Sequence, residues 1–123
     1  MGGKASREKG KRGEREWARV CREHGFDAHR TAQYRGNTGA AGDVEGLPGF
    51  HCEVKRTEKL LPWTYMEQSI HDSREAGKGE IPIVAWRRND YPWLVYLAAE
   101  DFFKIATPYM LEVEDGEKDK KDI

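Results

Sequence analysis

The stretch "GDVEGLPGFHCEVKRTE", residues 42 to 58, contains the pattern that decides the fold. Strand-like residues lie on both sides of the turn sequence "GLPG", which predicts a β-hairpin that brings Asp43 close to Glu53. Side chains at positions i and i+2 of a strand share one face, about 6.5 to 7 Å apart, so Glu53 and Lys55 point the same way. An exposed glutamate–lysine pair is common on sheet surfaces, and this pair alone is weak support for a functional site.

Three helices are predicted from apolar residues that recur at helical spacing. They cover about residues 11 to 24, 63 to 76 and 99 to 105. Pro62 and Gly77 are start and stop signals for the second helix. Its inner face is predicted to carry Trp63, Met66 and Ile70. The third helix is short and is expected to close the domain.

Five strands are predicted. Residues 26 to 34 alternate between apolar and polar, as in a half-buried strand, and residues 43 to 45 and 50 to 57 form the hairpin. Residues 81 to 86, "IPIVAW", are apolar on both faces, as in a central strand, and residues 93 to 98 return beside them. The element order is α-β-β-β-α-β-β-α, in which the second helix crosses over between parallel strands. The fold class is α/β with a mixed sheet.

Length and composition indicate one domain with a polar, hydrated surface. The chain has 123 residues, of which 37% are hydrophobic and 35% charged. We expect a flexible basic segment at residues 1 to 9, the domain at 10 to 111 and a charged, disordered tail at 112 to 123. The basic segment is compatible with phosphate contacts, and a merely solvated segment explains its charge equally well. No apolar run approaches the roughly 20 residues of a membrane span and the N-terminus does not resemble a secretory signal, so the default location is cytoplasmic.

The cysteines and histidines carry no metal or disulfide signature. Cys21 and Cys52 do not form a C-x-x-C pair, and both are interpreted as buried, reduced thiols. The four histidines lack the spacing of metal ligands, so no metal is assigned to them.

Glu14 differs from the other glutamates of the first helix because it shares a helical stripe with Trp17 and Cys21. A carboxylate on a core-facing stripe needs a cation, and a role at the helix start near the dipole is the alternative. Glu16 and Glu23 are expected to face water.

Glu14, Asp43 and Glu53, if they gather beside Lys55, offer a site for a hard divalent cation. Oxygen ligands suit Mg²⁺, and the chemistry that follows is phosphodiester hydrolysis, in which a lysine orients water or stabilises the transition state. Glu45 lies on the same strand face as Asp43 and remains an alternative ligand; spacing favours Asp43.

The pattern Asp43…Glu53-Val54-Lys55 with an upstream glutamate resembles the PD-(D/E)XK nuclease superfamily. The stretch "KGKRGEREWARVCREHGFDAHR" resembles the opening of the archaeal-type Holliday junction resolvases, and the resemblance covers about residues 10 to 105. It implies a restriction-endonuclease-like mixed β-sheet flanked by helices. It also implies that Asp43 and Glu53 bind Mg²⁺, for which Mn²⁺ substitutes, with Glu14 as a further acid at the metal and Lys55 as the catalytic lysine.

The resemblance further implies that Arg15 and Arg30 contact the scissile DNA strand. Arg30 also occupies the apolar register of its predicted strand, where a buried arginine needs an anion, and pairing with a core carboxylate is the alternative. Arg35 and Arg56 flank the site and are expected to follow a phosphate backbone, unless they are only solvated.

Two polar residues are candidates for supporting roles. Some relatives place a glutamine on the helix after the E-x-K strand, which points to Gln68. Thr38 would replace the serines that compact resolvases often carry in the glycine-rich loop, residues 35 to 42. Gly42 stands where the family signature has proline.

Together these features predict a Mg²⁺-dependent DNA endonuclease of the Holliday junction resolvase type, a homodimer that acts on branched DNA in recombination or repair. A two-fold dimer is expected because paired nicks across a four-way junction need two related active sites. Alternatives are a nuclease of the same fold that acts on flap, nicked or duplex DNA, and a non-catalytic nucleic-acid-binding module. A binding-only protein has no reason to keep unpaired acids facing a polyanion, which favours catalysis.

Overall fold

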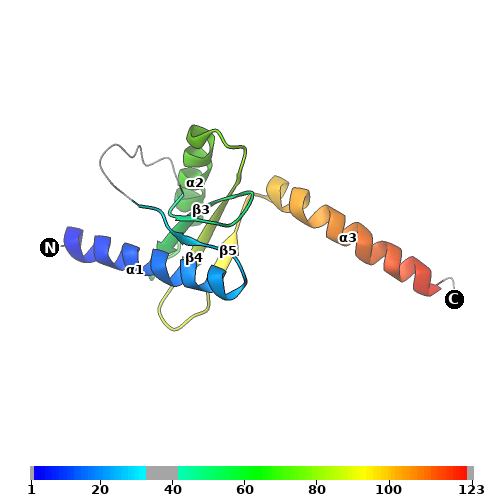
Figure 1. The fold of residues 1–123 in the computed structure, drawn as a ribbon, viewed down its shortest axis with the longest axis horizontal. Coiled ribbons are helices and arrows are strands. Elements are labelled where there is room, and N and C mark those ends of the chain that lie inside the picture. The colour runs from blue at the N-terminus through cyan, green and yellow to red at the C-terminus, as the bar shows by residue number, and fades with distance from the viewer. Residues whose placement is uncertain (1, 33–41, 122–123) are drawn as a thin grey trace.

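The structure, a computed structural model, describes residues 2–32 and 42–121, in which five strands form one sheet between helices (Figure 1). In chain order the elements are α1 (Gly2–Glu23), β1 (His29–Arg30), β2 (Val44–Glu45), β3 (Phe50–Arg56), α2 (Pro62–Ala76), β4 (Ile81–Arg87), β5 (Leu94–Tyr96) and α3 (Ala99–Lys121). This order is the predicted one.

The sheet is mixed, and its strand order is β1-β2-β3-β4-β5. β3 and β4 are parallel because α2 crosses over between them, whereas the other neighbours pair antiparallel. The β2–β3 turn needs glycine at position 46, where φ is 108° and a Cβ atom would lie 2.2 Å from the carbonyl oxygen of Asp27. The predicted hairpin and crossover are confirmed.

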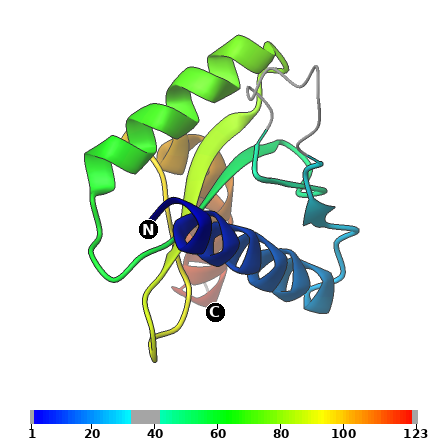
Figure 2. The same cartoon turned by 90° about the vertical axis from the view of Figure 1, so that its left-hand side faces the viewer.

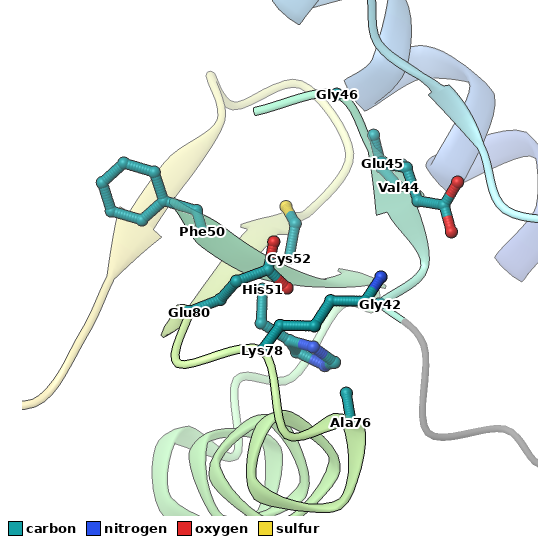
Figure 3. Close-up of a pocket in the computed structure, with 10 residues that line it drawn as sticks. All are labelled: Gly42, Val44, Glu45, Gly46, Phe50, His51, Cys52, Ala76, Lys78 and Glu80. Atoms are coloured by element: carbon teal, nitrogen blue, oxygen red, sulfur yellow. The ribbon is translucent and has the colours of Figure 1, made fainter. Parts of the chain in front are cut away.

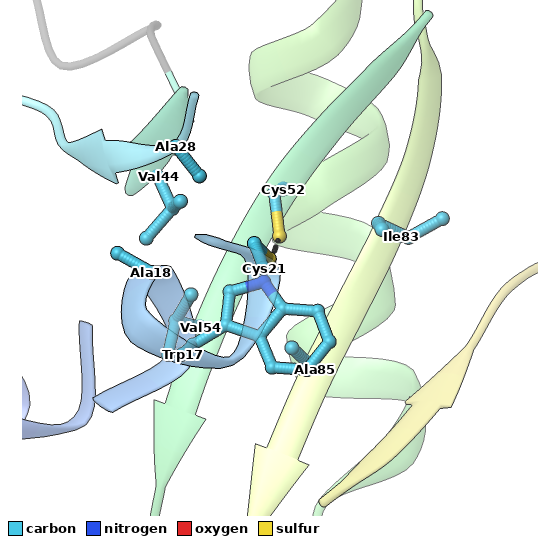
Figure 4. Packing of buried hydrophobic residues seen from close by; sticks show 9 residues of the cluster. All are labelled: Trp17, Ala18, Cys21, Ala28, Val44, Cys52, Val54, Ile83 and Ala85. Atoms are coloured by element: carbon cyan, nitrogen blue, oxygen red, sulfur yellow. Dashed lines mark hydrogen bonds between the residues drawn. The ribbon is translucent and has the colours of Figure 1, made fainter. Parts of the chain in front are cut away.

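The two faces of the sheet carry different helices (Figure 2). On one face α1 packs on β3 and β4 through a buried apolar cluster, and the indole Nε1 of Trp17 donates a hydrogen bond to Cys52 Sγ at 3.0 Å (Figure 4). On the other face α2 packs through Tyr65 and Met66 onto Val84 and Trp86. His51, Glu53 and Lys55 alternate with Cys52 and Val54 along β3 and therefore face the α2 side.

Both ends of the chain differ from the sequence prediction. α1 begins at Gly2, so residues 2–9 are helical where a flexible segment was expected, and α3 continues to Lys121 through the expected disordered tail. Both ends consist mostly of charged residues with good helix propensity, and ion pairs one turn apart support them, such as Lys11 with Glu8 at 3.8 Å. Helix formation there does not depend on an apolar stripe, the signal on which the prediction relied.

Several burial predictions were wrong. Trp63 is 68% exposed, because α2 turns Tyr65, Met66, Ser69 and Ser73 toward the sheet instead. The predicted strand at residues 26 to 34 is reduced to His29–Arg30 within the described part, and Phe26 is exposed. α3 does not close the domain; it leads away from the sheet (Figure 1). Residues 33–41, which include Tyr34, lie outside the described part.

Candidate active site

The hairpin of β2 and β3 places Asp43 against Glu53. The backbone N–H of Asp43 donates to the carbonyl oxygen of Cys52, and the N–H of Val54 donates to Asp43 Oδ2, each at 2.8 Å. These bonds hold the Asp43 carboxylate beside the part of β3 that carries Glu53.

Glu53 is a buried carboxyl group with a second acid next to it. Its side chain is only 3% exposed. Burial, and after it the Asp43 carboxylate, raises the pKa of Glu53 to about 9 against the opposing effect of Lys55. Without a cation Glu53 therefore keeps its proton at neutral pH. A divalent cation would take the place of that proton, so these two carboxylates fit a metal site.

Glu14 belongs to the same electrostatic group although it lies on α1. Burial raises the pKa of Glu14, Asp43 raises it further, and Arg30 and Lys55 oppose the shift. Arg30 Nε donates to Glu14 Oε2 at 2.5 Å, so β1 supplies the cation that a core-facing carboxylate needs. Arg30 thus pairs with a core carboxylate, which was the alternative for this residue.

Lys55 lies on the side of β3 that faces α2. Its Nζ is 3.8 Å from Glu53 Oε1 and 5.4 Å from the centre of the Tyr65 ring. The side chain is 25% exposed, so the ammonium group is held by an acid and an aromatic face and still reaches solvent. Electrostatic interactions therefore join Glu14, Asp43, Glu53 and Lys55 in one cluster, and their roles at a metal stay a prediction.

Comparison with known proteins assigns the chain to a family. A family model described as "Phage putative PDDEXK endonuclease" matches residues 5–120, nearly the whole chain. The chain belongs to this endonuclease family. The predicted relationship to PD-(D/E)XK nucleases is confirmed, and none of the curated proteins compared with the chain matches it.

A solved structure shares the fold of this endonuclease. Hjc of Archaeoglobus fulgidus, a Holliday junction resolvase from an archaeal hyperthermophile, is similar with a TM-score of 0.55 and 24% sequence identity. The match covers 72% of this chain and 76% of that one. The predicted restriction-endonuclease-like architecture is confirmed.

The basic residues predicted to bind DNA differ in their surroundings. Arg15 is exposed on α1. Arg56, at the end of β3, donates through Nε to Glu16 Oε2 at 3.3 Å, and Arg87 donates to Glu16 Oε1 at 2.7 Å. Glu16 keeps 36% of its side chain exposed and also pairs with these two arginines, which are the last residues of β3 and β4. Arg35 lies outside the described residues.

The structure describes two of the three remaining candidates, Gln68 and Glu45. Gln68 is exposed on α2, and Thr38 lies outside the described residues. Glu45 is exposed and pairs with His29, whose Nε2 is 3.3 Å from Glu45 Oε2. Asp43, and not Glu45, shares the Glu53 environment.

Sequence reasoning missed two residues beside Glu53. A ring nitrogen of His51 and carboxylate oxygens of Glu53 and Asp72 all lie within 4.8 Å of one another. The signal for His51 was its position two residues before Glu53, which puts both on one strand face. The signal for Asp72 was its helical spacing of seven from the buried Tyr65. Neither pattern shows that β3 and α2 bring the two residues together.

Proposed function

We propose that this protein is a Mg²⁺-dependent DNA endonuclease that hydrolyses phosphodiester bonds. The observation that carries the proposal is the gathering of Glu14, Asp43 and Glu53 around Lys55, three chain-distant acids and one amine in a partly buried cluster. Membership of an endonuclease family supports the same chemistry.

In the proposed site Asp43 and Glu53 hold the cation and Glu14 is a further acid beside it. These residues would hold Mg²⁺, or Mn²⁺ in its place, and the bound ion would supply an acidified water and neutralise charge on the phosphate. Lys55 orients the attacking water and stabilises the negative charge that develops on phosphate oxygens. Arg30 holds Glu14 in place, and a DNA phosphate that approaches the site competes for the same guanidinium group.

We propose that a basic pocket next to the Arg56 end of β3 contacts the DNA backbone. The pocket has a volume of about 280 Å³ and is lined by Lys9, Arg12, Glu16, Arg56 and Asn89. Arg56 Nη1 is buried and has no hydrogen-bond partner among the described residues. A buried guanidinium N–H without an acceptor is costly, and a phosphate oxygen would satisfy it. Arg15, exposed on α1, is assigned the same role.

Branched DNA is the proposed substrate. The fold shared with a Holliday junction resolvase supports it. Flap, nicked or duplex DNA is the alternative for the same site residues. A non-catalytic binding module is disfavoured, because two adjacent buried acids would repel a polyanion and contribute nothing to binding.

A homodimer is proposed from two exposed apolar surfaces on one chain. α3 carries an apolar stripe at helical spacing, made up of Phe102, Ile105, Tyr109 and Val113, all exposed. The sheet carries an apolar groove of about 430 Å³, lined by Trp17, Ile83, Leu97 and other apolar residues, among them Ile105 of the same chain's α3, so Phe102, Tyr109 and Val113 remain for a partner. Because α3 leads away from its own sheet, most of its stripe is available to the groove of a second copy (Figure 1).

Cleavage of labelled four-way junction, flap, duplex and single-stranded DNA, each with Mg²⁺ or EDTA, tests the proposal. We expect cleavage of the junction only with Mg²⁺, and loss of cleavage in Lys55→Ala. The exposed Lys59→Ala, four residues on, is the matched control and should cleave normally. If every substrate binds and none is cleaved with Mg²⁺ or Mn²⁺, the binding-module alternative is correct.

A further inference from the structure

A second group of potential ligands lies on the α2 side of Glu53. It consists of His51 and Glu53 on β3 and Asp72 on α2, whose donor atoms lie within 4.8 Å of one another. Ligands about 2.1 Å from a divalent ion are roughly 3 to 4.2 Å apart, so a small side-chain adjustment would let all three reach one ion. Asp43 is not part of this group.

One ring nitrogen of His51 is left without a partner in the part of the chain that the structure describes. The residue is 2% exposed, and its Nε2 is buried without a hydrogen-bond partner among the described residues. Buried polar atoms are normally satisfied, and an exception points to a ligand, an ion or a bound water.

The surroundings give access to His51. A pocket of about 250 Å³ between β2, β3 and the end of α2 is lined by His51 together with Ala76, Lys78 and Glu80 (Figure 3). The figure shows the imidazole between β3 and the end of α2, next to Ala76. A metal ion therefore has a route to the buried ring from outside.

We propose that His51, Glu53 and Asp72 form a second divalent-cation position, which shares Glu53 with the Asp43 site and prefers Mn²⁺ or a similar transition metal to Mg²⁺. The preference follows from the imidazole ligand, since Mg²⁺ favours oxygen donors and Mn²⁺ accepts nitrogen as well. One carboxylate that serves two neighbouring ions is the arrangement of two-metal hydrolytic sites. The inference rests on the proposed function only in so far as Glu53 is a metal ligand in both.

Pulsed EPR on the full, tag-free chain loaded with Mn²⁺ tests the proposal, with equilibrium dialysis to count the bound ions. We expect two Mn²⁺ per chain and a ¹⁴N modulation from a coordinated imidazole. His51→Gln should abolish the modulation and lose one ion. His24→Gln is the matched control, because His24 is an exposed histidine just after α1, which packs on the other face of the sheet, and it should keep both signals.

Asp72→Asn keeps the proposal testable if His51→Gln does not fold. Asp72 is at the half-buried surface of α2, and its amide variant should weaken Mn²⁺ binding at the second position roughly tenfold or more. A wild-type protein without ¹⁴N modulation, a modulation that survives in His51→Gln, or unchanged affinity in Asp72→Asn would overturn the proposal. These outcomes are separate from nuclease activity: Mg²⁺-dependent cleavage without nitrogen ligation rejects only this inference, and nitrogen ligation without cleavage rejects only the proposed function.

Discussion

Glu53 is the residue whose protonation should be visible in the stability of the metal-free protein. The pKa of its carboxyl group is about 4.5 in the unfolded chain and is raised to about 9 in the folded protein. Between these values the folded state binds more protons than the unfolded state, so stability is greatest at low pH and is lost as the pH rises toward 9. We predict that in EDTA the free energy of unfolding falls from pH 7 to pH 9 by about 1 kcal/mol per pH unit.

Urea unfolding at several pH values measures this slope. Glu53→Gln should flatten it, because the amide does not ionise, and Glu67→Gln, at an exposed position of α2, should leave it unchanged. The range from pH 7 upward avoids His51, whose lowered pKa gives a slope of opposite sign at lower pH. Equal slopes in wild type and Glu53→Gln would show that Glu53 is already ionised in the folded protein.

Individual residues show how much of the candidate site could be predicted from the sequence. Asp43 and Glu53 were predictable as neighbours because a hairpin and a two-residue strand period are local rules. Arg30 was identifiable from its register, and its partner Glu14 from its helical stripe. His51 and Asp72 were not identified, because their proximity depends on how α2 lies on β3, which no local pattern contains.

At the scale of elements, two glycines of α1 provide a matched pair. A Cβ atom at Gly13 would lie 2.7 Å from the Cβ of Arg56, so any larger residue must push α1 away from β3. A Cβ atom at Gly10 meets nothing within 4 Å. We predict that Gly10→Ala stabilises the protein by up to about 1 kcal/mol, as expected in a helix interior, and that Gly13→Ala destabilises it by about 1 to 3 kcal/mol.

Chemical denaturation of the two variants measures both effects. Gly13→Ala should also slow DNA cleavage, because the shift of α1 moves Glu14, the next residue in the helix. If both substitutions stabilise the protein alike, then α1 does not pack on β3 as closely as described.

Such close helix–strand contacts explain why the order of the elements was predictable but their packing was not. Periodicity identifies an apolar stripe, whereas the depth of the contact depends on both elements.

At the scale of the whole molecule, the proposed dimer depends on α3. We predict that the protein sediments as a dimer and that Tyr109→Lys shifts it to the monomer, because a buried lysine in the apolar stripe would lose its hydration. Asp115→Asn makes the same change in charge on the same helix outside the stripe and should leave the dimer intact. Analytical ultracentrifugation across a concentration series distinguishes the species, and a wild-type monomer at every concentration would contradict the prediction.

The overall shape was the least predictable feature. Strand order and crossover followed from short-range patterns, but the length and direction of α3 did not, since residues 114–121 at its end carry no apolar residue to mark a helix. Among residues 2–32 and 42–121, no helix is long and apolar enough to cross a membrane.

The central claim is that Asp43 and its neighbours form a cation-dependent nuclease site, and single-turnover cleavage of a labelled four-way junction in Mg²⁺ tests it most directly. Asp43→Asn keeps an oxygen that can accept the Val54 N–H and removes only the charge, so it should fold normally and cleave roughly 10²-fold or more slowly. Glu45→Gln, two residues further along the chain and exposed, should cleave at the wild-type rate. Equal rates for Asp43→Asn and wild type would contradict the account.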